Sequence, residues 1–118
     1  MSQLSVRERN LAALPVLTLE GELNINTAAD LRRSLIVHLK GKKPRLLVDL
    51  GGLKMMDTSG LATLIEAHIK AEKRGGRLVL FGLNEPMAGI FRVMHVDRLF
   101  CIAASEQEAQ SLLEGGGD

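Results

Sequence analysis

The residues best suited to chemistry are those of Asp57-Thr58-Ser59-Gly60, which combine two hydroxyls with a carboxylate. They follow the apolar segment Leu46–Leu50 and precede a strongly periodic apolar pattern. The motif therefore falls where a strand leads into a helix N-terminus. That end of a helix exposes unpaired backbone N–H groups and the positive pole of the helix dipole, so it favours an anion such as phosphate. A hydroxyl held there can become a phosphate ester without leaving the position that stabilises it.

A structural interpretation of the motif stands beside this chemical one. Asp, Ser and Thr are preferred at helix N-caps, because their side-chain oxygens accept hydrogen bonds from the first backbone N–H groups. Thr58 can be that cap, and Asp57 can serve equally well. The two interpretations are compatible, since one short loop can hold both a cap and a modification site.

The motif also has a superficial likeness to the Asp-[Ser/Thr]-Gly of aspartic proteases. In this sequence Gly60 follows one residue too late, and the surrounding pattern alternates strands with helices. The sequence contains no evident Ser–His–acid or Cys–His set. We therefore expect no enzymatic role.

Strand and helix patterns alternate on the N-terminal side of the motif. An edge-strand pattern at Leu4–Arg9 and a β-prone segment at Val16–Glu20 are joined by a short connection, which allows antiparallel pairing. Thr27–Asp30 has the spacing of a capping box before a helix with leucines at helical spacing. Leu46–Leu50 is typical of a buried strand, and Gly51-Gly52 predicts the turn out of it.

The same alternation continues after the motif. Its helix ends at Gly75-Gly76, and Arg77–Phe81 predicts the next strand. Asn84 is placed to cap a short helix, Phe100–Ala103 predicts a last strand, and Ser105–Glu108 forms a capping box for a final helix. Strands separated by single helices favour parallel pairing.

These patterns predict one α/β domain over residues 1–114, followed by a flexible Gly-rich tail over residues 115–118. We expect a mixed, mostly parallel sheet of four to five strands flanked by helices. Leu46–Asp49 and Arg77–Phe81 are expected at its centre, because their unbroken apolar character is typical of strands covered on both faces.

Composition narrows the possible partners. The net charge is +1, and the only aromatic residues are three Phe, so we expect neither nucleic acid nor an anionic membrane as a partner. The single Cys101 and the lack of a leader pattern favour a cytoplasmic protein. No segment approaches the roughly 20 apolar residues that span a bilayer. His38 and His95 have no second ligand pattern nearby, and we expect no metal and no cofactor.

In this arrangement the sequence resembles the STAS domain family, which includes the bacterial anti-sigma-factor antagonists. The resemblance covers nearly the whole chain, and the Asp-[Ser/Thr]-[Ser/Thr]-Gly-Leu element is quite specific in this context. It is carried by Gly21–Asn24, Val48–Leu50, Met56–Leu61, the Gly75-Gly76 helix stop and the apolar pattern from Leu78 to Ile102.

The resemblance implies a small mixed sheet with helices mostly on one face, and a regulatory function. In the antagonists, a serine/threonine kinase that is itself the anti-sigma factor phosphorylates the hydroxyl just after the Asp, and a cognate phosphatase reverses the modification. The unphosphorylated protein binds the kinase and so releases the sigma factor. Carried onto this sequence, the phosphoacceptor is Thr58, with Ser59 as the alternative.

Two positions depart from the antagonist pattern. Many antagonists have Ser where this chain has Thr58, and Thr also occurs there in scaffolds of stress-signalling complexes and in accessory subunits of lipid-transport ABC systems. Those two roles are the alternative functions. Asn24 stands where antagonists usually carry Asp, so a negative charge is missing at that position.

The partner is expected on the rim where neighbouring strands end, because open α/β sheets present their sites there. We expect Met55 to be partly exposed and Met56 to lie in the core. The predicted partner-binding residues are Leu23, Asn24, Ile25, Met55, Asp57, Thr58, Ser59 and Gly60.

Overall fold

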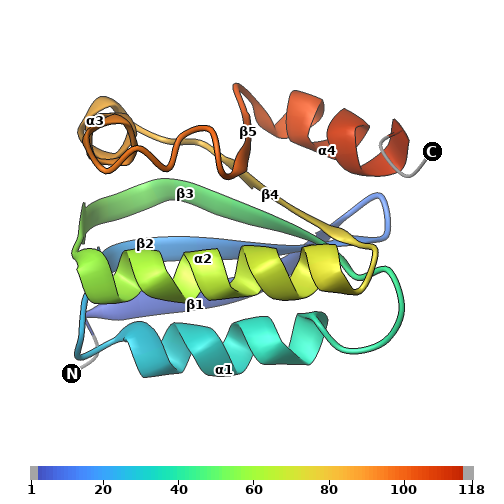
Figure 1. The fold of residues 1–118 in the computed structure, drawn as a ribbon, viewed down its shortest axis with the longest axis horizontal. Coiled ribbons are helices and arrows are strands. Elements are labelled where there is room, and N and C mark those ends of the chain that lie inside the picture. The colour runs from blue at the N-terminus through green and yellow to red at the C-terminus, as the bar shows by residue number, and fades with distance from the viewer. Residues whose placement is uncertain (1–2, 116–118) are drawn as a thin grey trace.

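One five-stranded sheet organises the computed structural model, which describes residues 3–115 (Figure 1). The spatial order is β1-β2-β3-β4-β5; β1 is antiparallel to β2, and the other neighbours are parallel. This confirms the predicted mixed sheet with β3 and β4 inside it. The strands are β1 (Leu4–Leu11), β2 (Leu14–Leu23), β3 (Arg45–Met56), β4 (Arg77–Phe81) and β5 (Cys101–Ala103). The helices are α1 (Ala28–His38), α2 (Thr58–Lys73), α3 (Glu85–Val93) and α4 (Glu106–Gly115).

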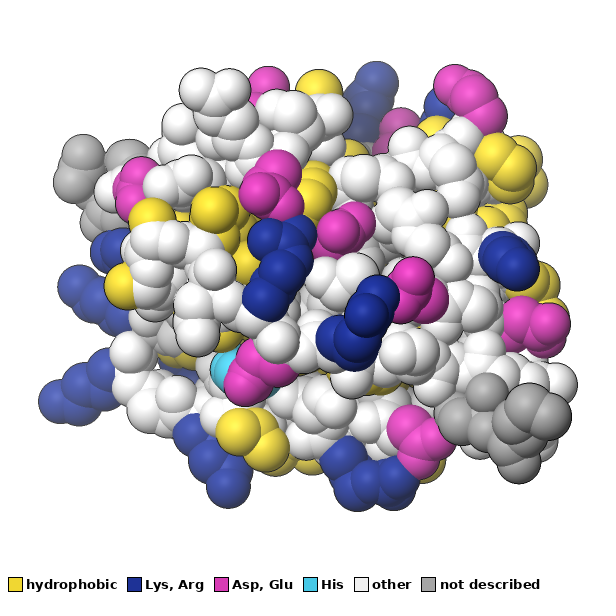
Figure 2. Space-filling view, turned by 180° about the vertical axis from the view of Figure 1, so that it is seen from behind, with side chains coloured by type: hydrophobic (Ala, Val, Ile, Leu, Met, Phe, Trp, Pro, Cys, Tyr) yellow, Lys and Arg dark blue, Asp and Glu magenta, His cyan; other side chains and the backbone are white. Residues whose placement is uncertain are grey.

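The two faces of the sheet are covered unequally. Alternate residues of a strand point to opposite faces, so Leu46 and Val48 pack with α1, α2 and α3, while Leu47 packs with α4. Beyond α4 this second face is polar, and Arg9 there contacts Thr18 and forms ion pairs with Asp49 and Glu106. Figure 2 shows acidic and basic side chains interspersed over this face.

The third strand is longer than the sequence predicts. The expected turn at Gly51-Gly52 is wrong, because β3 continues through both glycines to pair Met56 with Leu23 of β2. The register shifts twice along this ladder, and the strands approach closely at Gly52. A Cβ at Gly52 would lie 2.9 Å from the Leu19 carbonyl oxygen. Gly52 thus allows β3 to continue beside β2 to the rim.

The helix caps agree with the sequence in two cases and differ in one. Asn84 caps α3 by accepting from the Met87 N–H, and Ser105 accepts from the Glu108 N–H at the start of α4. The predicted capping box at Thr27 is wrong, since the Thr27 side chain makes no capping bond to α1.

The structure describes the C-terminal end of the chain only as far as Gly115. Helix α4 continues to Gly115, and residues 116–118 lie outside the described part of the chain, so the expected flexible tail stays a prediction. Within residues 3–115, no helix has the length and apolar character needed to cross a membrane.

Candidate functional site

The candidate site is the rim where β2 leads into α1 and β3 leads into α2, at the left edge of Figure 1. Backbone and side-chain bonds tie the two connections together. The Asp57 N–H donates to the Leu23 carbonyl at 3.1 Å, and the Asp57 carboxylate accepts from the Ile25 N–H, also at 3.1 Å. Asp57 therefore ties the motif to the end of β2 through its backbone N–H, and to the loop after β2 through its side chain.

Two positions of Asp57-Thr58-Ser59-Gly60 are used by the fold itself. Asp57 is the N-cap of α2, and its Oδ1 accepts from the Gly60 N–H at 3.0 Å. Gly60 is buried against β2, where a Cβ would lie only 2.5 Å from Cγ of Leu23. The alternative left open by the sequence is thereby resolved: Asp57 is the cap, and Thr58 is the first helical residue.

The two hydroxyls of the motif are not used in this way. Thr58 is exposed and Ser59 is half-buried. Among the contacts of residues 3–115, neither hydroxyl makes a hydrogen bond. The Thr58 hydroxyl thus stands in solvent at the positive end of α2, where the first backbone N–H groups of a helix favour an added negative charge.

The adjoining loop of residues 24–27 has the opposite character. Thr27 is 4% exposed; its hydroxyl donates to the Glu22 carbonyl and accepts from the Asn24 N–H, both at 2.9 Å. Asn24 is 8% exposed, and its Oδ1 accepts from the Asn26 N–H while its Nδ2 donates to Gln3. The side chains of Asn24 and Thr27 are therefore engaged within the fold.

The exposed apolar side chains of the rim are Ile25 and Met55. Ile25 is 72% exposed and Met55 39%, whereas Met56 is buried, as the sequence analysis expects. Three residues of the predicted partner-binding set, Leu23, Asn24 and Gly60, are buried in the isolated domain, and the assignment of the whole set stays a prediction. Those positions shape the rim and offer little surface to a partner.

The remaining candidates for chemistry lie apart from this rim. His68 packs edge-on against Phe100, with ring centroids 5.5 Å apart. Burial raises the pKa of the Cys101 thiol on β5. Within the described residues, no group of His, Cys, Asp and Glu is arranged to hold a metal ion.

Comparison with known proteins identifies the same architecture. A family model described as "Mlab, STAS domain" matches residues 6–103. The anti-sigma-B factor antagonist of Listeria monocytogenes is 26% identical over 105 residues, covering 89% of this chain and 91% of that protein. An anti-sigma factor antagonist from Mycobacterium paratuberculosis superposes with a TM-score of 0.83 at 17% identity, covering 94% of each chain. The Bacillus cell fate determinant SpoIIAA in its phosphorylated form gives a TM-score of 0.69 at 18% identity, covering 92% of this chain and 99% of that one.

Proposed function

This chain belongs to the STAS domain family, and from that membership we propose that it is an anti-sigma factor antagonist, a protein-binding module switched by phosphorylation of Thr58. Its partners are an anti-sigma-factor serine/threonine kinase, bound when Thr58 is unmodified, and a cognate phosphatase. The name of the Listeria relative and the phosphorylated form of the Bacillus structure support this assignment. The protein itself is not an enzyme in this scheme.

The proposal rests on one observation: some residues of the motif hold the fold, and a different one presents a free hydroxyl. Asp57 caps α2 and Gly60 packs on β2, while the Thr58 hydroxyl is exposed and free of hydrogen bonds among the described residues. Modifying Thr58 therefore breaks no bond that the fold uses. A phosphate adds about −1.5 to −2 charges at pH 7, and the helix N-terminus stabilises such a charge.

The effect on a partner follows from the surroundings of Thr58. Ile25 and Met55 offer apolar contacts, and Ser59 lies next to the acceptor. A partner docked over this rim would remove water from the phosphate and from the neighbouring Asp57 carboxylate. Desolvating two like charges is costly, so the complex should weaken while the isolated domain stays folded.

Mapping the modified residue tests the proposal. The protein is incubated with ATP and the cognate anti-sigma-factor kinase, and the phosphorylated residue is located by mass spectrometry. We expect phosphate on Thr58, none on the Thr58→Ala variant, and unchanged modification of a Ser59→Ala control. Phosphate found on Ser59 alone would contradict the assignment.

A second candidate function uses the same rim. The threonine at position 58 also fits an accessory subunit of a lipid-transport ABC system or a stress-signalling scaffold, as the family resemblance implies. Purification of the tagged protein from its source cells separates the candidates. Recovery of a permease and an ATPase supports transport, whereas recovery of a kinase supports the antagonist.

A further inference from the structure

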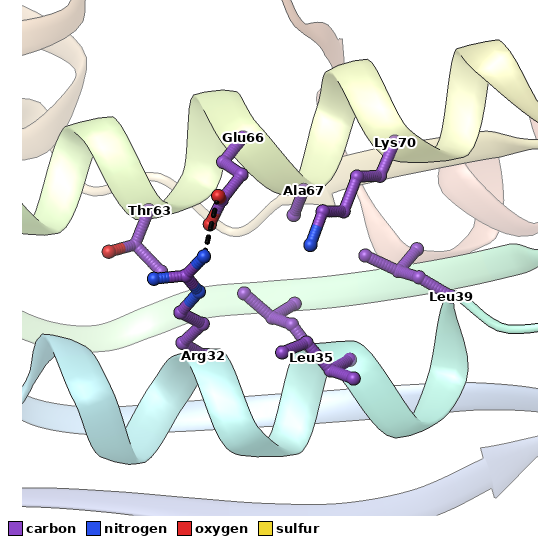
Figure 3. Close-up of a pocket in the computed structure, with 8 residues that line it drawn as sticks. Arg32, Leu35, Leu39, Thr63, Glu66, Ala67 and Lys70 are labelled. Carbon is purple, nitrogen blue, oxygen red and sulfur yellow. Dashed lines mark hydrogen bonds and ion pairs between the residues drawn. The ribbon is translucent and has the colours of Figure 1, made fainter.

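Away from the rim, a concave surface lies between α1 and α2, toward their C-terminal ends. Figure 3 shows the two helices side by side, with Leu35, Leu39 and Ala67 between them. Toward the helix ends the groove widens into a cavity of about 570 Å³, whose apolar floor includes Ile36 and Leu39. Between the helices themselves the space is only about 10 Å³, and the Arg32–Glu66 ion pair crosses it. We therefore call the larger cavity at the helix ends the α1–α2 groove.

The rim of the α1–α2 groove is basic. Lys40, Lys70, Lys73 and Arg74 line the cavity. Among the ion pairs of residues 3–115, none involves any of these cations. In Figure 3 the Lys70 side chain extends from α2 toward α1. Cations at helix C-termini complement the helix dipole, but the dipole does not explain why they surround an apolar cavity.

The connection after α1 is held against the end of α2, which fixes this basic rim. The Arg74 guanidinium donates to the Gly41 carbonyl at 3.0 Å, and the Lys43 N–H donates to the Arg74 carbonyl at 2.9 Å. Lys42 and Lys43 of this connection are exposed and add to the same charge. Figure 2 shows Lys and Arg side chains projecting from the left edge, which corresponds to the right-hand end of Figure 1.

We propose that the α1–α2 groove is a second docking site, and that its occupant is an acidic amphipathic helix of a partner protein. A groove between two helices accepts a third helix, whose apolar residues fill the floor at spacings of three and four. Glu or Asp side chains on that helix would pair with Lys40, Lys70 and Lys73. The groove lining contains no aromatic side chain on which a nucleic-acid base could stack.

The docking site is independent of the proposed switch at Thr58. Lys70 lies twelve positions after Thr58 on α2, a distance of about 18 Å along the helix axis. Charges at that separation are largely screened, because the Debye length is about 8 Å at physiological ionic strength. A partner in the groove can therefore stay bound in both states of Thr58.

Fluorescence anisotropy tests the proposal with a labelled 14-residue synthetic peptide that places Leu on one helical face and Glu on the other. We expect saturable binding to the full chain, and at least tenfold weaker binding to the Lys70→Glu/Lys73→Glu variant. The matched control Lys54→Glu/Arg98→Glu makes the same charge change at exposed positions outside the groove and should stay within twofold. A peptide with every Leu replaced by Gln should bind at least tenfold more weakly, and Thr58→Glu should bind like the unaltered protein.

Several outcomes would overturn the proposal. They are no saturable binding, equal loss in the matched control, equal binding of the Gln peptide, or tighter binding of a single-stranded oligonucleotide or of phosphatidylglycerol vesicles. Circular-dichroism melts check the fold of each variant. If Lys70→Glu/Lys73→Glu is unfolded, the neutral variant Lys70→Gln/Lys73→Gln decides by the same loss of at least tenfold.

Discussion

Two threonines on the same rim have opposite environments. Thr27, before α1, is buried and its hydroxyl bonds to Glu22 and Asn24, whereas Thr58, at the start of α2, is exposed and its hydroxyl has no such bond in the described structure. Both follow a strand and both stand at a helix N-terminus. The Thr58 hydroxyl is accessible because a neighbouring residue makes the hydrogen bonds that hold this part of the rim.

That neighbouring residue is Asp57, which joins β3 to α2. Asp57 caps α2 and accepts from the Ile25 N–H, so the side chain of Thr58 is not needed for hydrogen bonds that hold the rim. The comparison predicts that substitution of Thr27 acts on stability and that substitution of Thr58 acts on binding. The following variants test this division, beginning with the largest expected change in stability.

Replacing each threonine by valine gives the most direct contrast in stability. Thr27→Val keeps the shape of the side chain but leaves the Asn24 N–H and the Glu22 carbonyl without their partner. The free energy of unfolding should fall by about 2 to 3 kcal/mol, because buried polar groups lose their bonds. Thr58→Val serves as the matched control and should change it by less than about 0.5 kcal/mol. Urea titrations measure both; similar losses in the two variants would refute the contrast.

Replacing Asp57 tests whether its side chain stabilises the fold by capping α2. Asp57→Ala loses the bonds to Gly60 and Ile25, and should lower the free energy of unfolding by about 1 to 2 kcal/mol. Asp57→Asn keeps one acceptor oxygen for the Gly60 N–H and should lose less. If thermal melts rank the two variants in the reverse order, capping is not the role of Asp57.

The missing charge at Asn24 provides a smaller test. In Asn24→Asp the bond to the Asn26 N–H is kept, and the bond to Gln3 can be restored by rotating the Gln3 amide. We expect less than about 1 kcal/mol of lost stability, and a larger change in affinity or in phosphorylation rate. Melts and phosphorylation time courses on the same sample measure the two effects. Loss of stability without any change in rate or affinity would assign Asn24 to the fold alone.

Met55 should show the smallest change in stability and a clear change in binding. Its side chain is partly exposed, so Met55→Lys should change the free energy of unfolding by less than about 0.5 kcal/mol. The same variant should weaken kinase binding at least tenfold, because it removes an apolar contact and adds a charge. Titration calorimetry, with Val37→Lys as a control at an exposed apolar position on α1, tells a local effect from a general one. Full binding by folded Met55→Lys would remove Met55 from the surface.

The sequence predicts those features whose causes are local. The caps at Asn84 and Ser105 depend on residues three positions away, and the central strands have their own apolar runs. The family resemblance adds Thr58 as the proposed acceptor within the motif. The sequence allows either Asp57 or Thr58 to cap α2, and the contacts of Asp57 with Ile25 and Gly60 identify Asp57 as the cap.

The features that the sequence missed depend on residues far apart in the chain. The Thr27 hydroxyl is drawn away from α1 by groups at the end of β2, and β3 passes through Gly51-Gly52 because β2 pairs with it there. The α1–α2 groove brings Lys40, in the connection after α1, together with Lys70 and Lys73 of α2, about thirty positions later in the chain. In the sequence such lysines are typical of an exposed helix face, and their common rim appears only when the helices pack.

The affinity of the kinase for the two phosphorylation states tests the central claim most directly. Unmodified protein and protein fully phosphorylated on Thr58 are titrated against the cognate anti-sigma-factor kinase, and the melting temperature of each form is measured beforehand. We predict that phosphorylation weakens binding at least tenfold and leaves the domain folded. Equal affinity of the two folded forms, or unfolding of the phosphorylated domain, would contradict the claim that phosphorylation of Thr58 switches binding without destabilising the fold.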